Sequence, residues 1–353
     1  MKPAVLALVA GLFAATTQAL AMPPCHQQGE FRPYCGFRQP EDLESLPDGH
    51  HLVVSQMNLT FSAQGFVFGP GKLSLLDTRN GRIRDLYPGK IAEGRPTPGW
   101  GDPGCPGEIG ADLSPHGIHL SRRADGRRQL LVINHGGREA VEFFELNGLR
   151  LTWRGCAVAP KGSTLNDVAA RPEGGFIASN MIDGTPAQAA QAMARAMRGE
   201  DTGFVWSWSP MFSYQKVPGS EGTLPNGVQV DAQGRYLYYS VVGPQGAVRK
   251  IDLRTYRIVG AAATPNPDNL SWDGRRLLAA GVMDHAALSQ CDGTATCRSA
   301  SHVTAIDPDT MQATRLFEQD GSRQWGISVG VTMGRRLYIG AFAGDRVLSV
   351  PRK

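Results

Sequence analysis

Five oxygen-bearing side chains stand a few residues before glycine turns in different parts of the chain. Glu41, Asn166 and Asn226 each lie eight residues before such a glycine, and Asp268 and Asn269 lie six and five residues before another. If these segments are copies of one unit, the five side chains converge at one place. Buried carboxylates without a counter-charge are costly, and calcium prefers six to eight hard oxygen ligands. The set therefore predicts a calcium site.

Two further acids directly follow members of this set. Asp42 follows Glu41, and Asp167 follows Asn166. Because successive residues of a strand point to opposite faces, the second acid of each pair cannot share the first site. The doubled acids predict a second, structural calcium site held by Asp42, Asp167 and backbone carbonyls. The alternative is that each Asp is an ordinary turn residue bonded to its own backbone.

Two of the eight histidines lie at predicted strand ends within the same part of the chain. His116 belongs to SPHGIHL and His135 to LLVINHGG. A histidine by itself is usually structural. Beside a metal ion, however, an imidazole that titrates near neutrality is suited to act as a base that activates water.

The elements that must position these residues are revealed by a sixfold repeat. A turn ending in glycine, followed by a short apolar run, occurs with its glycine at 49, 126, 174, 234, 274 and 334, a mean spacing of 57 residues (285 divided by 5). Further β-rich stretches lie between the turns, at 72–77, 141–146, 248–253, 302–307 and 346–350. Propeller blades repeat on roughly 40 to 50 residues plus insertions. The pattern predicts an all-β, six-bladed β-propeller, whose innermost strands line a central channel.

Two segments interrupt the repeat. TPAQAAQAMARAMRG, at 185–199, is built of strong helix formers and predicts a short helical insertion. It either packs on the propeller or walls a substrate pocket. The Pro/Gly-rich stretch at 88–115 predicts a surface loop over one face.

The first 21 residues combine Lys2, an apolar run over 4–15 and a small-x-small ending at 19–21, which predicts a secretory signal peptide. Residues 22–353 would then form a single propeller domain, and no later run of 18 apolar residues predicts a transmembrane segment. The net charge of +4 is too small for a nucleic-acid-binding surface. We expect a periplasmic or secreted protein, and its oligomeric state stays open.

All six cysteines lie beyond the predicted signal peptide, which favours disulfides in an exported protein. Six cysteines allow 15 connectivities. Proximity suggests the pairs Cys25–Cys35 and Cys291–Cys297, which leaves Cys105 with Cys156.

Six stretches of the chain resemble, in the same order, those of the paraoxonases, a family of calcium-dependent arylesterases and lactonases with six-bladed propellers. The stretches are PEDLESLPDG (40–49), SPHGIHL (114–120), LLVINHGGREAVEFFEL (130–146), LNDVAA (165–170), LPNGVQVDAQGRYLYYS (224–240) and PDNLSWD (267–273). Each is short, but together they run through five of the six predicted blades.

The resemblance implies two calcium sites and a histidine dyad. The implied ligands of the catalytic calcium are Glu41, Asn166, Asn226, Asp268 and Asn269. The implied ligands of the structural calcium are Asp42, Asp167 and the carbonyl of Ile118. In the dyad, His116 would deprotonate the attacking water and His135 would shuttle its proton.

Three features depart from the family. The chain ends in VLSVPRK without a cysteine, so the family's disulfide between the N-terminal segment and the C-terminus has no counterpart to close the ring. A predicted cleavable signal replaces the family's retained hydrophobic N-terminus. The loop at 88–115, which carries Cys105, differs in character and bears on substrate access.

These observations favour an exported calcium-dependent hydrolase that opens small lactones and cleaves aryl esters. One alternative is a sugar lactonase of the gluconolactonase type, which shares the fold and an acid and asparagine metal site. An alternative of another class is a non-enzymatic propeller that uses calcium for stability and binds a ligand on one face.

Overall fold

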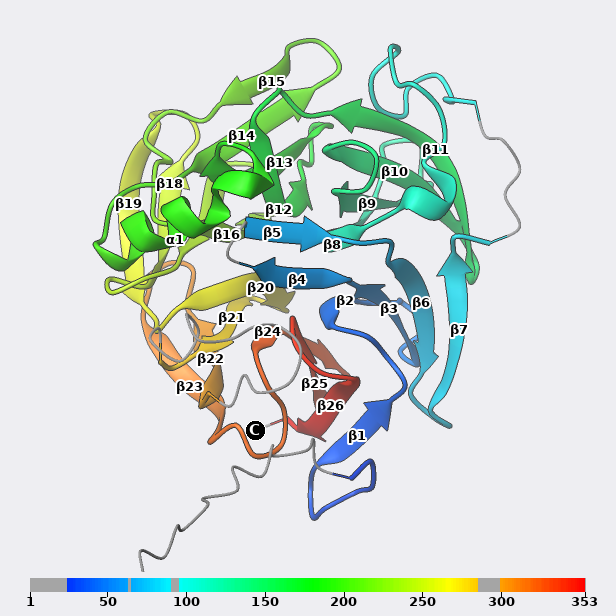
Figure 1. The fold of residues 1–353 in the computed structure, drawn as a ribbon, viewed down its shortest axis with the longest axis vertical. Coiled ribbons are helices and arrows are strands. Elements are labelled where there is room, and N and C mark those ends of the chain that lie inside the picture. Colours follow the sequence, from blue (N-terminus) through cyan, green and yellow to red (C-terminus); the bar gives the residue numbers. More distant parts are fainter. Residues whose placement is uncertain (1–23, 63–64, 90–94, 285–298, 353) are drawn as a thin grey trace, which may run out of the picture.

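The computed structural model describes residues 24–62, 65–89, 95–284 and 299–352. Six four-stranded antiparallel sheets are arranged around a common axis (Figure 1). This arrangement confirms the predicted six-bladed β-propeller.

Each of the first three blades runs outward from the axis in chain order. Blade 1 consists of β2 (Pro40–Ser45), β3 (His51–Gln56), β6 (Lys72–Asp77) and β7 (Arg82–Tyr87). Blade 2 consists of β8 (Pro115–Arg122), β9 (Arg128–Asn134), β10 (Ala140–Asn147) and β11 (Arg150–Val158). Blade 3 consists of β12 (Ser163–Ala170), β13 (Phe176–Asp183), β14 (Phe204–Ser209) and β15 (Ser213–Lys216).

The other three blades follow the same plan, with one exception in the last. Blade 4 consists of β16 (Pro225–Val230), β17 (Tyr236–Val241), β18 (Ala247–Asp252) and β19 (Arg257–Ala263). Blade 5 consists of β20 (Pro267–Asp273), β21 (Arg276–Val282), β22 (Ser301–Ile306) and β23 (Ala313–Gln319). Blade 6 consists of β24 (Ile327–Met333), β25 (Arg336–Ala341), β26 (Arg346–Pro351) and, outermost, β1 (Arg32–Cys35).

The six repeat glycines all lie in the same turn, between the first and second strand of a blade. Their backbone φ angles run from +60° to +100°, a region that glycine adopts without a steric penalty. The repeat in the sequence therefore marks one hairpin per blade.

The N-terminal strand closes the ring. β1 pairs antiparallel with β26, from Arg32 opposite Ser349 to Cys35 opposite Arg346. The first and last parts of the chain thus complete one sheet by backbone hydrogen bonds, a closure that removes a free edge. A disulfide between Cys25 and Cys35 ties the segment before β1 to its end. The missing C-terminal cysteine is therefore not needed for closure.

The apolar core lies between the facing sides of neighbouring blades. One cluster joins Leu43 and Val54 of blade 1 to Val329 and Tyr338 of blade 6. Similar clusters lie between the other neighbouring blades, because the facing sides of two packed sheets both present apolar side chains. The six sheets therefore form a rigid frame around the axis.

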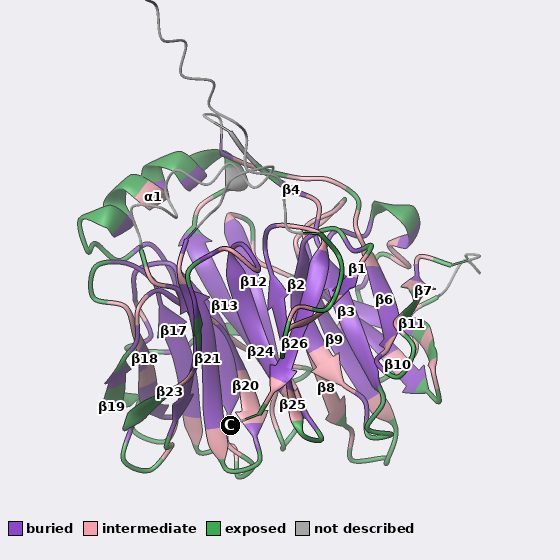
Figure 2. Cartoon of the chain, turned by 90° about the horizontal axis from the view of Figure 1, so that it is seen from below, coloured by how far each residue is buried: buried purple, intermediate pink, exposed green. Residues whose placement is uncertain are grey.

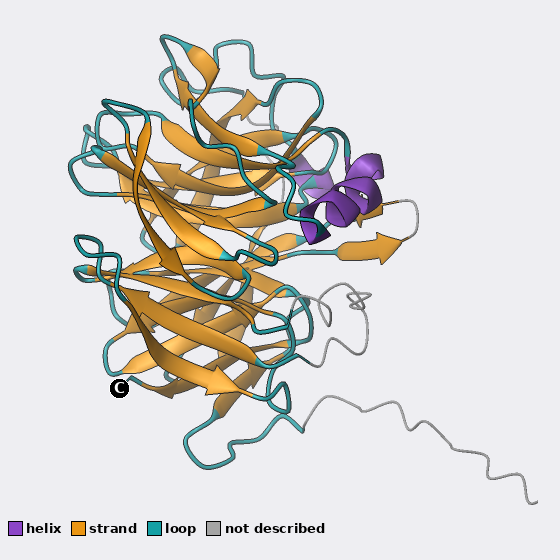
Figure 3. Cartoon of the chain, turned by 90° about the vertical axis from the view of Figure 1, so that its left-hand side faces the viewer, coloured by secondary structure: helices purple, strands orange, loops and turns teal. Residues whose placement is uncertain are grey.

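Two insertions cover one end of the axis. A hairpin of β4 (Leu59–Ser62) and β5 (Gly65–Phe68) is inserted in blade 1, and a 3-10 turn (Pro186–Gln188) leads into α1 (Ala189–Met197) in blade 3. The hairpin and the helix contact each other and stand beyond the ends of the blade strands (Figures 2 and 3). The structure confirms the predicted helical insertion at 185–199.

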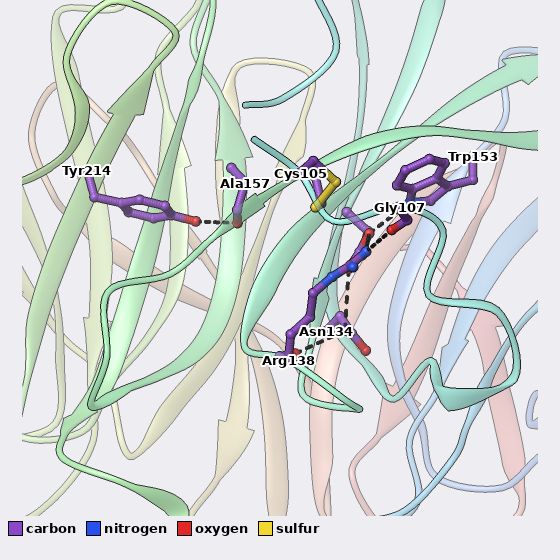
Figure 4. Close-up of a disulfide and its surroundings, with 9 residues drawn as sticks. Cys105, Gly107, Asn134, Arg138, Trp153, Ala157 and Tyr214 are labelled. Carbon is purple, nitrogen blue, oxygen red and sulfur yellow. Dashed lines mark hydrogen bonds and ion pairs between the residues drawn. A yellow bond between two sulfur atoms is a disulfide. The ribbon is translucent and has the colours of Figure 1, made fainter. Parts of the chain in front are cut away.

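The Pro/Gly-rich loop packs against the outside of blade 2 in its described part. Trp100 is buried, and the amide of Asp102 donates to the carbonyl of Cys156 in β11. A disulfide joins Cys105 to Cys156, and Arg138 donates to the carbonyl of Gly107 beside it (Figure 4).

Two of the three predicted disulfides are therefore confirmed, at Cys25–Cys35 and Cys105–Cys156. The predicted pair Cys291–Cys297 and the predicted signal peptide at 1–21 lie outside the described residues. Within the described ranges, no helix has the length and apolar character needed to cross a bilayer.

Candidate metal and catalytic site

The innermost strands of all six blades break their pairing register at the same level. In β2 the pairing jumps from Pro40 to Asp42, and in β20 it jumps from Pro267 to Leu270. A bulge frees a residue from the ladder and redirects its side chain. The inner-strand residues left without a cross-strand partner at this level are Glu41, His116, Gly117, Asn166, Asp167, Asn226, Gly227, Asp268, Asn269 and Ser328.

Two glycines make this crowding at the axis sterically feasible. A Cβ on Gly117 would lie 2.6 Å from the Cα of Asp167 in the next blade, and a Cβ on Gly227 would lie 2.4 Å from the carbonyl oxygen of Asp268. The Pro-His-Gly and Pro-Asn-Gly sequences thus place a functional side chain and then leave room for the bulge of the neighbouring blade.

The five residues predicted to hold calcium come together. Asn269 Nδ2 donates to Glu41 Oε1 at 2.6 Å, and the carboxyl groups of Glu41 and Asp268 repel each other electrostatically. The side chain of Asn226 donates a hydrogen bond to the carboxyl group of Asp268. Asn166 reaches the same group through His116, with 3.4 Å between Asn166 Nδ2 and His116 Nε2.

Four buried oxygens of this set are left without a hydrogen-bond partner among the described residues. They lie on the inner strands of four different blades and are Glu41 Oε2, Asn166 Oδ1, Asn226 Oδ1 and Asn269 Oδ1. An unsatisfied buried oxygen costs about 1 to 3 kcal/mol. Unpartnered hard oxygens that converge at one point are the donor set that a calcium ion requires, so the residues present fit this metal.

Burial also makes the acids of this region poor at carrying charge by themselves. Burial, followed by repulsion from Asp42, raises the pKa of Asp268 to about 8. Burial and repulsion from Asp42 and Asp268 hold the pKa of Glu41 well above its usual range. Among the described groups that shift these two pKa values there is no lysine or arginine.

Among the described residues, no group of three or more His, Cys, Asp or Glu side chains is placed to hold a metal ion. The candidate site instead combines two carboxylates with three carboxamides. Its fit to calcium thus depends on the amide oxygens.

The predicted second site has a different local arrangement. Asp42 accepts hydrogen bonds from the amides of Leu43 and Ile118, at 2.8 and 2.7 Å. Asp167 likewise accepts from the amides of Val168 and Val228, both at 2.7 Å. Each carboxylate therefore accepts two amide hydrogen bonds, one from its own strand and one from the inner strand of the next blade, and these bonds need no metal. A structural calcium ion at Asp42, Asp167 and the Ile118 carbonyl stays a prediction.

The two predicted histidines are direct neighbours. His116 Nδ1 and His135 Nε2 lie 2.9 Å apart. His135 Nδ1 in turn lies 3.0 and 3.1 Å from the two carboxylate oxygens of Glu139. Burial, and then the neighbouring His135, hold the pKa of His116 well below its usual range, which keeps it neutral near pH 7.

A cavity of about 280 Å³ opens above this polar group. Its floor consists of Glu41, His116, Asn166, Asn226, Asn266 and Asp268. Its walls and roof are mainly apolar and include Met57, Leu59, Phe66, Phe68, Met181, Met193, Leu224, Val242, Val282 and Phe342. The hairpin and α1 thus wall the pocket, which is one of the two roles considered for the helix. None of the described residues of the 88–115 loop lines it.

Sequence reasoning missed the hydroxyl groups that hold the bulges. Ser55 donates to the carbonyl of His116 at 2.5 Å, and Ser240 donates to the carbonyl of Asp268 at 2.7 Å. Both serines end the apolar run of a second strand, in LVVS and YLYYS. The recurrence of a serine at this position in two blades is the sequence signal that could have identified these hydroxyl groups.

Ser328 also belongs to this group, although its sequence suggests another role. It lies in Gly-Ile-Ser-Val-Gly at 326–330, which matches the Gly-x-Ser-x-Gly pattern of serine hydrolases. In those enzymes the serine stands on a turn between a strand and a helix. Ser328 instead lies within β24 and donates to the carbonyl of Glu41 at 2.5 Å. It fastens the bulge of blade 1 and is not placed as a nucleophile.

Three solved structures share the fold over nearly the whole chain, each at 15% sequence identity. A candidate gluconolactonase from a structural-genomics programme gives a TM-score of 0.51 and covers 92% of each chain. A gluconolactonase from Xanthomonas campestris gives 0.50, with 95% of this chain and 100% of that chain covered. A glucose dehydrogenase also gives 0.50, with 92% and 99% covered. No family model matches the sequence, and no curated protein matches it.

At this identity the likeness shows the six-bladed fold, which hosts both hydrolytic and redox activities in these three proteins. Two of the three are gluconolactonases, the type considered above as the alternative to a paraoxonase-like enzyme. The resemblance to paraoxonases stays a prediction.

Proposed function

We propose that the protein is an exported, calcium-dependent hydrolase that opens lactones whose substituents are apolar. The observation that carries the proposal is the convergence of four unpartnered oxygens beside a histidine pair on the floor of an apolar cavity. The gluconolactonase structures with the same fold support lactone chemistry. The two disulfides are compatible with an oxidising compartment.

Glu41, Asn166, Asn226, Asp268 and Asn269 would hold the calcium ion. Calcium at this position would supply Lewis-acid polarisation of the lactone carbonyl.

The histidine pair would prepare water as the nucleophile. His116 Nε2 lies at the floor of the cavity, 3.8 Å from Glu41 Oε1. This nitrogen would accept a proton as the water oxygen attacks the carbonyl carbon and the ring C–O bond breaks. The proton would then be returned from His116 Nε2 to the departing alkoxide, while His135 would share the positive charge of the pair through its contact with His116 Nδ1.

The lining of the cavity supports one of the two classes of lactone. A sugar lactone carries several hydroxyl groups, each of which needs a hydrogen-bond partner when it is buried. The described walls offer mainly methionine, phenylalanine and aliphatic side chains. Alkyl or aryl substituents fit this surface, which favours aliphatic lactones and aryl esters over sugar lactones.

The test is a panel of an aliphatic γ-lactone, an aliphatic δ-lactone, a sugar lactone and phenyl acetate, assayed with calcium and after chelation. We expect turnover of the aliphatic lactones that chelation abolishes and added calcium restores. Asp268→Asn should reduce this turnover sharply at saturating calcium, whereas His116→Gln should leave a measurable part. Full activity after chelation would contradict the proposal.

The gluconolactonase type is the second candidate, because two of the structures that share the fold carry that description. Turnover of the sugar lactone alone would establish it in place of the first. If no substrate is turned over while calcium still raises the melting temperature, the protein is a binding propeller stabilised by calcium.

A further inference from the structure

Glu139 occupies a loop between β9 and β10 that no sequence pattern singled out. Its carboxylate lies within hydrogen-bonding distance of His135 Nδ1 through both oxygens, at 3.0 and 3.1 Å. The side chain of His135 is 1% exposed and that of Glu139 is 18% exposed. An ionised carboxylate can only accept hydrogen bonds, so the proton of this contact belongs to His135 Nδ1.

This contact determines where the other protons of the pair lie. A neutral imidazole has one donor and one acceptor nitrogen. With Nδ1 of His135 as donor, its Nε2 must accept, and the donor across the 2.9 Å contact is His116 Nδ1. The remaining nitrogen, His116 Nε2, then carries a lone pair that faces the cavity floor. Without an acceptor at Glu139, this arrangement would depend on the longer contact of 3.4 Å in which Asn166 Nδ2 donates to His116 Nε2.

Glu139 is itself held in place from a neighbouring blade. Its Oε1 accepts a hydrogen bond from the amide of Leu165 in β12, at 2.6 Å, and Leu165 directly precedes the proposed ligand Asn166. On the other side, Phe68 of β5 stacks on the ring of His135, with 3.8 Å between ring centroids. The imidazole is thus fixed in both position and plane.

The loop that carries both residues is braced at its two ends. Asn134 accepts from the amides of Ser114 and Gly136, at 2.9 and 3.0 Å. Arg138 forms two hydrogen bonds of 2.8 Å with the buried carboxylate of Glu142. Because these contacts hold the backbone on either side, the Glu139 carboxylate has little freedom to leave the imidazole.

We propose that Glu139 is a positioning residue that fixes the tautomers of His135 and His116, so that His116 Nε2 is the basic nitrogen of the site. The inference deepens the proposed function and rests on it. Glu139 touches neither the substrate cavity nor a proposed calcium ligand side chain. It acts through His135.

Glu139→Gln tests the inference because the amide nitrogen can donate to His135 Nδ1 and so favour the wrong tautomer, while the amide oxygen can still accept from Leu165. General-base catalysis contributes typically 100- to 10,000-fold, so we expect kcat to fall about 100-fold with KM changed by less than about twofold. The double variant with His135→Gln should lose no more than His135→Gln alone, since the two residues act as one unit. Additive losses would overturn the inference.

A spectroscopic measurement on calcium-free protein tests the predicted tautomers directly and does not depend on enzymatic activity. In ¹⁵N-histidine-labelled protein, Nδ1 of His135 should give a protonated-type shift and its Nε2 a bare-type shift, assigned with His135→Gln and His116→Gln. Glu139→Gln should reverse or mix the two types. Unchanged shifts in the variant would overturn the inference, whether or not the wild-type protein hydrolyses any lactone.

Glu145→Gln is the matched control. Glu145 lies in β10 and pairs with Arg154 at 2.8 Å, away from the histidines, so its loss should leave kcat and the histidine shifts unchanged. If Glu139→Gln does not fold, Glu139→Asp replaces it. The shorter carboxylate keeps the correct tautomer, so normal shifts with a smaller loss of kcat are expected, and a changed tautomer would refute the argument.

Discussion

Replacing Asn226 by alanine should reduce the stabilisation that calcium confers on the protein. The side-chain oxygen of Asn226 is one of the four that have no hydrogen-bond partner among the described residues. Asn226→Ala removes that oxygen from the proposed site but leaves Glu41, Asn166 and Asn269 in place. The quantity to compare is therefore the difference between melting temperatures with and without calcium, in which the cost of the substitution itself cancels.

The expected size follows from binding linkage. A calcium ion that binds only the folded protein at 1,000 times its Kd adds about 4 kcal/mol. For about 300 folded residues, an unfolding entropy of about 2.1 cal/mol/K per residue converts this to about 6 °C. If losing one ligand weakens binding about 100-fold, the protein is at only ten times Kd. The increment then falls to about 1.4 kcal/mol, or about 2 °C.

Differential scanning calorimetry in calcium and in chelator, on wild type and variant, measures both increments. Gln229→Ala is the matched control, because Gln229 is a buried carboxamide on the same strand whose amide donates to the carbonyl of Leu270 at 3.1 Å. This variant should melt lower than wild type in both conditions and keep the full calcium increment.

Two results would refute the reasoning. An increment in Asn226→Ala equal to that of wild type would mean that the orphaned oxygen does not contact the cation. A wild-type protein with no calcium increment at all would mean that the converging oxygens do not form a calcium site, and that the protein tolerates them unpaired.

Three other predictions rest on separate parts of the molecule. Because each buried methylene contributes about 0.8 kcal/mol, kcat/KM should rise about fourfold per added methylene along a series of alkyl-substituted γ-lactones, measured by pH-stat; a flat series would argue against the apolar pocket. The Cys105–Cys156 bridge spans a sequence separation of 51, so its double alanine variant should lose about 4 kcal/mol of unfolding free energy in urea titrations, and a loss below 1 kcal/mol would be contrary to the chain-entropy argument. Burial lowers the pKa of His302 to about 4, so its contribution is complete above pH 6.5 and about 3 kcal/mol is lost as the pH falls to 4; urea titrations of His302→Gln should show a shallower acid loss than wild type.

The architecture and most of the site could be predicted because they leave periodic marks in the sequence. Each blade needs a tight turn between its first two strands, and glycine is the residue that adopts the required positive φ. The proposed ligands stand five to eight residues before that glycine, so the sixfold repeat also locates the inner strands. The gathering of the acids and amides at the axis followed from this placement, whereas the pairing of His116 with His135 was implied by the resemblance to the paraoxonases.

Other features left no mark that the repeat could reveal. Ring closure depends on β1, a four-residue strand whose role is set by pairing with β26 at the opposite end of the chain. Glu139 ends the five-residue loop between β9 and β10, and the loop of the same length in blade 4, at 242–246, contains no acidic residue, so the repeat does not point to this position. Its function becomes visible only when Leu165 of the next blade and His135 are both in place.

The bulges bear on an inconsistency in how the predicted ligands were assigned to two sites. Strict strand alternation separates Asp42 from Glu41, yet the same rule would also separate Asp268 from Asn269, which were assigned to one site. In β20 the register skips both residues, so neither follows the alternation of the ladder. In β2 the register skips Glu41 alone, and Asp42 stays paired with Ser55 while its carboxylate turns to the amide of Ile118. The length of the bulge does not decide by itself whether two adjacent polar residues share a site, because in β12 the register also skips both Asn166 and Asp167. Asp167 nevertheless turns to the amide of Val228 in the next blade, so the partner that each side chain finds across the axis decides which site it joins.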